Sequence, residues 1–213
     1  MPAIPAMAEH AYDPLASPAL RHALPGIVVA FDEAAILAHV QAALAVQPGY
    51  AIIGCELEQG TYTPGEGCVA RYILAVEGEM ASSALVSAQL FADASASAAF
   101  FEHRLAPLAG QVAQRPELRW CAQPVAHLPE LAMVLFAYPL DGELPELLGA
   151  ADGAGMRAHL ASLLGTYTPD TCEPELVDYG RQRRCTLRYR LGGADGDMLV
   201  YGKLTGDGSV ALA

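Results

Sequence analysis

The side chains best suited to chemistry in this sequence are four cations near its C-terminal end. Arg181, Arg183 and Arg184 fall in a basic stretch between two expected strands, and Lys203 falls late in a third. Phosphate oxygens attract such donors, and a lysine acts on them as a compact point charge. The pattern therefore indicates phosphate binding. It is also compatible with a solvated lysine on an edge strand.

Paired carboxylates are a second candidate. Glu56 with Glu58, and Glu173 with Glu175, stand two residues apart and would share one face of a strand. Such pairs serve acid–base catalysis or a site for a metal and a triphosphate. That site also needs several further basic strands, which the sequence does not offer. Residues 195–197 (Asp-Gly-Asp) fit a hairpin turn better than a calcium loop.

Three strands are needed to position the four cations, and the stretch from Cys172 to Lys203 contains them. An earlier stretch repeats this layout, with strands expected at Tyr50–Gln59, Cys68–Val76 and Leu85–Ala92. In the second of these, residues 68, 70, 72 and 74 fall on one face, so we expect a sheet covered on that side and only partly covered on the other.

The two stretches align as an internal repeat. At an offset of 117 the identical pairs are Tyr50/Tyr167, Cys55/Cys172, Glu56/Glu173, Glu58/Glu175, Tyr62/Tyr179, Cys68/Cys185, Arg71/Arg188, Tyr72/Tyr189 and Leu74/Leu191. After the next turn the offset becomes 114, which places Gln89 under Lys203. Before the strands it is 120, which places His39 over His159. Two copies at so long a period indicate a tandem duplication rather than a solenoid.

The remaining pattern completes the first copy. Asp32 can cap a helix before the strands. Ser95 can cap a later helix that Pro107 kinks or divides, and two strands follow near Arg119–Ala126 and Leu131–Tyr138. We expect an irregular Pro/Ala-rich leader over residues 1–31, a first unit over 32–141, and a second unit over 142–213 that is truncated after its third strand.

Charge and cysteine content restrict the partners and the compartment. A net charge of -12 argues against nucleic-acid and membrane binding. Five cysteines without a CxxC pair or a nearby histidine predict a reducing cytoplasm rather than a disulfide framework or metal site. The N-terminus has no signal-peptide pattern, and no apolar run approaches the length of a membrane span.

A family resemblance rests on these same stretches. YGRQRRCTLRYRL followed by LVYGKLTGDG resembles the start of the kinase lobe in the aminoglycoside-phosphotransferase-like family, and TYTPGEGCVARYIL is similar to the same motif. LAMVLFAYPLDGELPELL resembles the fifth strand of that lobe and the connection after it. The resemblance covers roughly Asp32 to Gly208. It implies an α+β fold, with a small antiparallel five-stranded sheet and a helix like the N-lobe of a kinase, followed by a partial second copy.

The resemblance also implies a site and a reaction. Lys203 would hold the α/β-phosphates of ATP with Mg²⁺, the three arginines would close over them, and a hydroxyl of a small molecule would receive the phosphoryl group. The first copy carries Gln89 at the lysine position, so it is expected to be a degenerate lobe. Glu102, where an ion-pair partner of such a lysine would lie, is expected to be a solvated helix residue.

Motifs of the second, helical lobe of such enzymes are missing from the sequence. There is no catalytic-loop His-x-Asp with its following Asn, and no Asp-Phe-Gly-like triplet. We therefore expect the N-terminal part of an ATP-dependent small-molecule phosphotransferase that does not catalyse by itself and binds nucleotide weakly or not at all. The partner of this part would be a missing C-terminal lobe. The alternative is a non-catalytic α+β module that docks onto a protein partner through its duplicated sheet.

Overall fold

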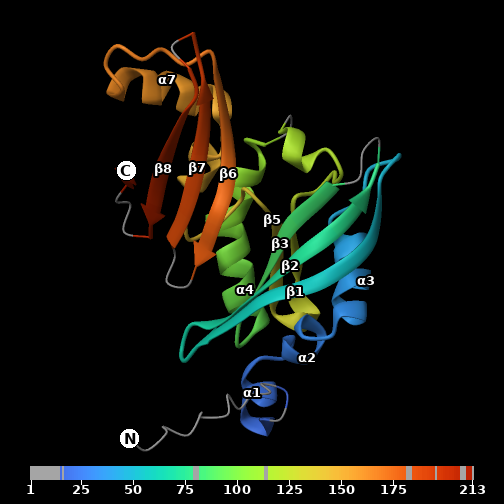
Figure 1. The fold of residues 1–213 in the computed structure, drawn as a ribbon. Coiled ribbons are helices and arrows are strands. Elements are labelled where there is room, and N and C mark those ends of the chain that lie inside the picture. The colour runs from blue at the N-terminus through green and yellow to red at the C-terminus, as the bar shows by residue number, and fades with distance from the viewer. Residues whose placement is uncertain are drawn as a thin grey trace, which may run out of the picture.

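The computed structural model of this chain has an α+β fold with two antiparallel sheets, as expected from the sequence (Figure 1). It describes residues 15, 17–78, 82–112, 115–180, 184–194, 196–206 and 210–212. The first sheet has five strands in the order β1-β2-β3-β5-β4, and the second has four in the order β6-β7-β8-β9. Each sheet has a hydrophobic core of its own.

The first unit carries the five-stranded sheet and the helices that cover it. Its strands are β1 (Ala51–Thr63), β2 (Gly67–Glu77), β3 (Ser82–Leu90), β4 (Val125–Leu128) and β5 (Met133–Ala137). Its helices are α1 (Pro18–Ala23), α2 (Ile27–Ala30), α3 (Glu33–Ala43), α4 (Ala94–Phe100), the π-helix η2 (Phe101–Leu105), α5 (Ala106–Ala109), and the 3₁₀ turns η3 (Pro116–Leu118) and η4 (Pro129–Leu131). Three strands, a helix and two strands follow one another in the predicted order, but the fourth strand begins at Val125, so the expected strand at Arg119–Ala126 is wrong for residues 119–124.

The expected irregular leader is wrong for residues 18–30, which form α1 and α2. Leu20, Leu24, Ile27 and Ala30 of this segment are buried in the first core. Short helices of this kind depend on tertiary packing rather than on local propensity, so a Pro/Ala-rich composition conceals them. Residues 1–14 and 16 lie outside the described residues.

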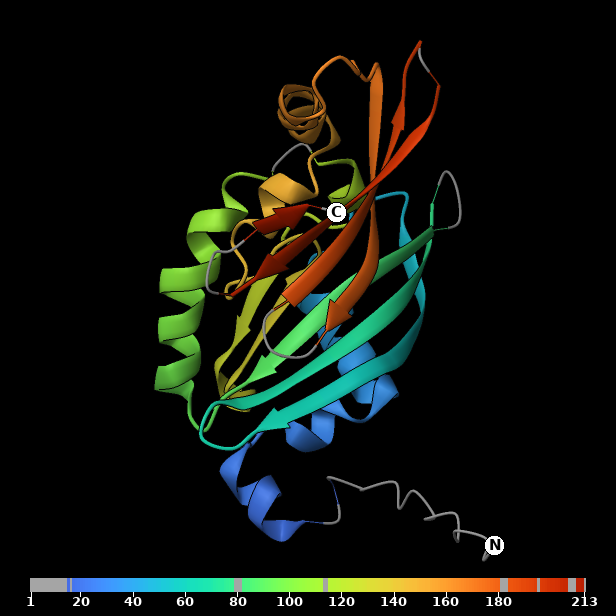
Figure 2. The ribbon, with the colours of Figure 1, turned by 60° about the vertical axis from the view of Figure 1, so that its left-hand side comes forward.

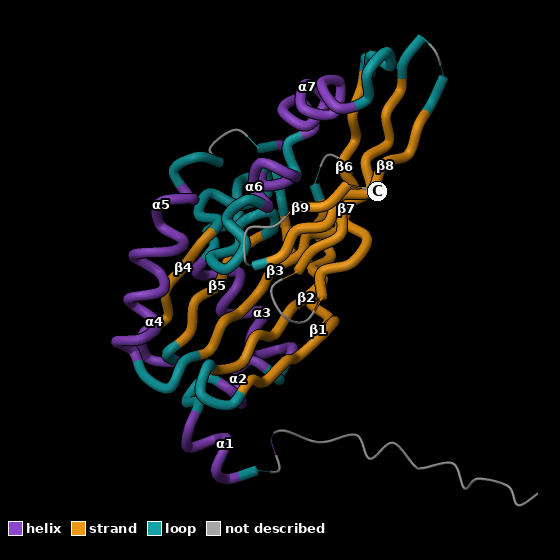
Figure 3. The backbone as a smooth tube through the Cα atoms, turned by 90° about the vertical axis from the view of Figure 1, so that its left-hand side faces the viewer, coloured by secondary structure: helices purple, strands orange, loops and turns teal. Residues whose placement is uncertain are grey.

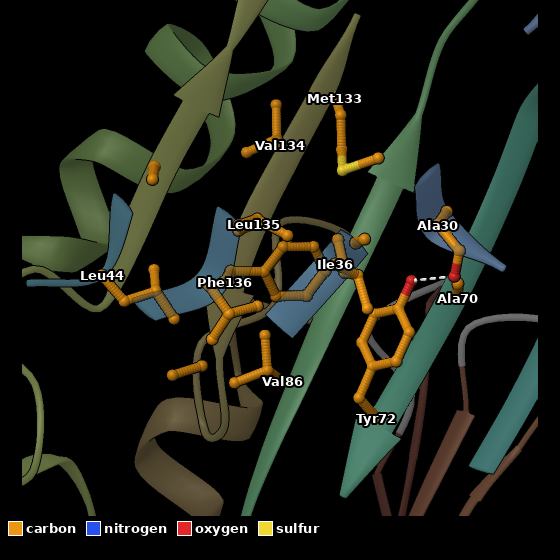
Figure 4. Close-up of a cluster of buried hydrophobic side chains, with 14 of the residues drawn as sticks. Ala30, Ile36, Leu44, Ala70, Tyr72, Val86, Met133, Val134, Leu135 and Phe136 are labelled. Atoms are coloured by element: carbon orange, nitrogen blue, oxygen red, sulfur yellow. Dashed lines mark hydrogen bonds between the residues drawn. The ribbon is translucent and has the colours of Figure 1, made fainter. Parts of the chain in front are cut away.

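One face of the first sheet packs against α2 and α3. Tyr72 and the neighbouring small and apolar residues of β2 are buried there, as their alternation predicted. The hydroxyl of Tyr72 donates a hydrogen bond to the carbonyl oxygen of Ala30 over 2.7 Å, and Ile36 of α3 lies beside it (Figure 4). This bond satisfies a buried polar group and fixes α2 against the sheet.

The helix after β3 is interrupted where its sequence suggested. Its N-cap is Asp93, not Ser95, and the Asp93 carboxylate accepts from the N–H of Ala96 over 2.8 Å. The chain then passes through η2 into α5, whose second residue is Pro107. Because proline lacks an N–H, Pro107 cannot donate the helical i to i−4 hydrogen bond. The π-helix η2 lies just before it in the chain.

The second unit repeats the first half of this plan. It consists of α6 (Leu147–Ala150), α7 (Gly153–Leu163), β6 (Thr171–Gly180), β7 (Arg184–Gly192), β8 (Met198–Thr205) and β9 (Val210–Leu212). The expectation that this unit ends after its third strand is wrong, because β9 pairs antiparallel with β8. β9 takes the place beside β8 that β5 takes beside β3 in the first sheet.

Strand register confirms the internal repeat residue by residue. Cys68 faces Leu90 across β2 and β3, and Cys185 faces Leu204 across β7 and β8. β1 and β6 each contain one irregularity, between Leu57 and Gln59 and between Leu176 and Asp178. The bounds of α2 and α3 map onto those of α6 and α7 at an offset of 120, with Asp32 and Asp152 as the N-caps of α3 and α7. The duplication thus extends further toward the N-terminus than the sequence pattern alone indicated.

The two sheets lie side by side, with the residue-180 end of β6 over the first sheet (Figures 2 and 3). Arg71 of β2 and Tyr179 of β6 meet there. Tyr179 pairs with Cys185 and packs on the core of the second unit, so this contact lies on the face of the second sheet that carries α6 and α7.

Candidate functional site

Lys203 lies on β8 and is exposed, with Thr186 of β7 as its cross-strand neighbour. Arg184 begins β7 opposite Thr205 and is also exposed. Because side chains alternate along strands, Lys203 and Arg184 share one face of the second sheet. β8 is flanked by β7 and β9, so the face of the sheet, rather than an open edge, exposes this lysine. Arg181 and Arg183 lie outside the described residues.

We call this surface the Lys203 face. Its residues, which point away from α6 and α7, are Glu173, Glu175, Asp178, Arg184, Thr186, Arg188, Arg190, Leu199, Tyr201 and Lys203. The opposite face carries Cys185, Leu187, Tyr189 and Leu191 and packs on the helices. Of the side chains predicted to bind phosphate, Lys203 and Arg184 are therefore placed on an open surface.

Ion pairs occupy most of the charges on the Lys203 face. Arg188 Nε donates to Glu175 Oε2 over 3.1 Å and its Nη2 donates to Glu175 Oε1 over 2.7 Å. This arginine lowers the pKa of Glu175. Arg190 Nη1 lies 4.0 Å from Glu173 Oε2. Glu173 and Glu175, one of the two carboxylate pairs considered as a metal or triphosphate site, thus neutralise arginines. The described residues contain no cluster of three or more side chains that could hold a metal ion.

The first copy differs at the lysine position as the alignment predicted. Gln89 stands opposite Val69 in the register that places Lys203 opposite Thr186, and it is half-buried. Glu102 is exposed in η2, which agrees with the expected solvated residue. Within the part of the chain that the structure describes, no ion pair joins Glu102 to a cation.

A polar cluster that the sequence did not reveal joins the two units. The Arg71 guanidinium lies 3.9 Å from the centre of the Tyr179 ring, and its Nη1 donates to the Tyr179 carbonyl oxygen and, over 3.2 Å, to Gln59 Oε1. The Tyr179 hydroxyl donates to Asp141 Oδ2. Asp141 Oδ1 in turn accepts from the N–H of Glu143 over 2.7 Å.

Burial dominates the electrostatics of this cluster. Arg71 is 9% exposed and Asp141 is 8% exposed. Burial raises the pKa of Asp141, although the hydrogen bond from Tyr179 and the charge of Arg71 act in the opposite direction. Burial and the adjacent carboxyl hold the pKa of Tyr179 well above its ordinary value, so its hydroxyl stays a donor at neutral pH. These groups connect the two units through hydrogen bonds and a cation–π contact, although the buried Nε of Arg71 has no hydrogen-bond partner among the described residues.

A serine and a histidine are in contact in the first unit, as they are in some nucleophilic catalytic sites. Ser97 Oγ and His127 Nε2 are 2.9 Å apart. Ser97 is fully buried, and the Ala94 carbonyl oxygen lies 3.0 Å from its hydroxyl as an acceptor. When the hydroxyl donates to that carbonyl, the imidazole N–H donates to Ser97, and a histidine that donates does not take the serine proton. This pair, with Phe101 stacked on the imidazole 5.8 Å away, fastens α4 and η2 to β4.

A cavity of about 350 Å³ lies on the other face of the second sheet, between that sheet and α6 and α7. Tyr189, Met156 and Leu204 line it, and Lys203 does not. Lys203 and Arg184 are therefore on the face of the sheet opposite this cavity.

Comparison with known proteins found no matching family model, curated protein or solved structure. In the described residues, no helix has both the length and the apolar character needed to cross a membrane.

Proposed function

We propose that this chain is a non-catalytic α+β interaction module that binds a protein partner through the Lys203 face. The observation that carries the proposal is a difference in burial between the copies. Ser87 of β3 is 4% exposed, whereas its counterpart Tyr201 is 36% exposed. Leu85 is half-buried, whereas its counterpart Leu199 is 54% exposed.

The elements that cover the corresponding face of the first sheet suggest that the partner of the second sheet is helical. Tyr179 packs over Arg71 there, and α4 reaches the same face through the contact between Ser97 and His127. Large aromatic and aliphatic side chains exposed together on a sheet typically mark an interaction site. We infer that the partner presents an amphipathic helix whose apolar stripe covers Leu199 and Tyr201 in the way that α4 covers part of the first sheet.

The charge of Lys203 on the Lys203 face favours an acidic residue on the partner helix, beside its apolar stripe. Glu173 and Glu175 already face Arg190 and Arg188. Lys203 has no carboxylate partner among the described residues, and it lies two residues along β8 from Tyr201. An acidic side chain at the border of the partner helix would complement this lysine, giving orientation more than affinity.

Site-specific photo-crosslinking in cells tests this proposal. p-Benzoylphenylalanine in place of Tyr201 should give an adduct with one partner protein, and the same residue in place of Ile53, which is exposed on the first sheet, should not. With that partner purified, Tyr201→Ser, which installs the residue of the first copy, should weaken binding about tenfold or more, and Ile53→Ser should not. An adduct between two copies of this chain, or no adduct, contradicts the proposal.

Nucleotide binding is the second candidate, because Lys203 and Arg184 share an exposed face. In this alternative the chain is the N-terminal part of an ATP-dependent phosphotransferase, and these cations contact the phosphates of ATP bound with Mg²⁺. Calorimetric titration with ATP and Mg²⁺ should then show weak saturable binding that Lys203→Ala abolishes. Absence of binding, or affinity that Lys203→Ala leaves unchanged, contradicts a nucleotide role.

A further inference from the structure

Two residues that line the cavity of the second unit are smaller than their counterparts in the first unit. Val29 of α2 packs against the first core, and its counterpart is Gly149 of α6. A Cβ atom at Gly149 would meet no atom within 4 Å. Ala88 of β3 corresponds to Gly202 of β8, which also lines the cavity. The same backbone plan therefore encloses a packed core in one copy and a space of about 350 Å³ in the other.

The side chain of Tyr189 lines this space. Tyr189 is only 1% exposed, and its hydroxyl makes no hydrogen bond to any described residue. Its counterpart Tyr72 donates to the carbonyl oxygen of Ala30. Burial raises the pKa of Tyr189, so the group is neutral and can donate at physiological pH. An acceptor on a molecule bound in the cavity can therefore pair with this hydroxyl, as the Ala30 carbonyl oxygen pairs with that of Tyr72.

The lining defines the chemistry of that acceptor. Met156, Leu204, Ala150 and the two glycines give a mainly apolar surface. Glu146 lines the cavity and is exposed, and the chain as a whole carries a net charge of -12, so an anionic ligand is disfavoured. A cavity of 150 Å³ holds one benzene, so this one can hold roughly 10–15 non-hydrogen atoms.

We propose that this cavity binds a small, neutral, mainly apolar molecule that carries a carbonyl or similar acceptor, to which the Tyr189 hydroxyl donates. The molecule enters past Glu146 and His159, which are exposed lining residues, and contacts Met156 and Leu204. This site is separate from the Lys203 face, because Tyr189 and Lys203 lie on opposite faces of the sheet. Binding here does not depend on a partner at that face.

Two matched probes test the proposal by NMR. Acetophenone has an aromatic ring and a carbonyl group, and ethylbenzene has the ring without the acceptor. In the full chain with ¹³C-methyl methionine, both should shift the Met156 methyl signal saturably, and acetophenone should bind more tightly. Met156→Leu identifies the signal among those of the six methionines.

Variants then separate the hydrogen bond from the space. Tyr189→Phe should weaken the binding of acetophenone about three- to tenfold, because one hydrogen bond is lost. It should leave the affinity for ethylbenzene unchanged, because that probe has no acceptor. Gly149→Val, which installs the residue of the first copy, should weaken both probes at least tenfold. Gly110→Val, at another exposed glycine with free space around a Cβ, should change neither. The proposal is overturned if no saturable shift occurs, if Gly149→Val binds both probes normally, or if Tyr189→Phe weakens both equally.

Discussion

Removing the hydroxyl of Tyr179 should destabilise the chain far more than its small size suggests. This group donates to Asp141, whose carboxyl is buried at the junction of the two units. Tyr179→Phe leaves that carboxyl, which is 8% exposed, with one donor fewer. Hydrogen bonds to charged groups are worth about 1.5–3 kcal/mol. For a chain of this size each kcal/mol lowers Tm by about 2–4 °C, so we expect a fall of about 3–12 °C.

The duplication supplies the control for this measurement. Tyr62 is the counterpart of Tyr179 in the first copy, is 46% exposed, and has no hydrogen-bond partner for its hydroxyl among the described residues. Tyr62→Phe should therefore change the free energy of unfolding by less than about 0.5 kcal/mol. Both variants are compared by urea unfolding followed by circular dichroism. Equal effects of the two substitutions would refute the assigned role of the Tyr179–Asp141 bond.

The pH dependence of stability gives a second measure of the same cluster. Because burial raises the pKa of Asp141, the folded chain binds this proton more tightly than the unfolded chain does. Its contribution to stability is therefore complete below the ordinary pKa of an aspartate, about 4, and is lost as the pH rises through the raised value. Tyr179→Phe removes an interaction that lowers this pKa, so it should deepen the loss, and Asp141→Asn should abolish it.

Further expectations concern the helix caps and the thiols. Asp32 accepts from two backbone N–H groups and Asp152 from one, so replacing either by alanine should cost about 0.5–2 kcal/mol in urea unfolding, with the larger cost at Asp32. Burial raises the pKa of Cys68 to about 11 and those of Cys121 and Cys185 to about 12, so Ellman's reagent at pH 8 should reach these thiols only on unfolding. Since the folded chain keeps these protons more tightly, stability should fall as the pH rises above about 8.5 through these values.

Local pattern was sufficient to predict the sheet and the equivalence of its copies. The alternation of Cys68, Ala70, Tyr72 and Leu74 predicted the buried face, because side chains on one face recur every second residue. The change of offset across a turn predicted that Gln89 and Lys203 occupy the same position, and strand register bears this out. Identity between copies constrains structure more strongly than a motif of a few residues does.

Long-range contacts were not predictable from that pattern. The partners of the junction are 108 residues apart for Arg71 and Tyr179 and 38 apart for Tyr179 and Asp141. Their counterparts Arg188 and Tyr62 make different contacts, so the repeat itself conceals the cluster. β9 is too short to show a period, and it forms because β8 offers it a row of free backbone groups.

The differences between the copies suggest which unit is specialised for binding. Both share a sheet, helices and caps, so the shared residues are explained by folding. Gly149 and Tyr201 instead are unfavourable for an isolated chain. A cavity lowers the free energy of unfolding because packing contacts are missing, and an exposed aromatic side chain promotes non-specific association. Replacing Gly149 by Val, the residue of the first copy, should raise the free energy of unfolding by about 0.5–2 kcal/mol while weakening the binding of both probes at least tenfold. Replacing Tyr201 by Ser should weaken partner binding about tenfold or more. If Gly149→Val lowers the free energy of unfolding instead, the glycine supports the fold and is not a specialisation for binding.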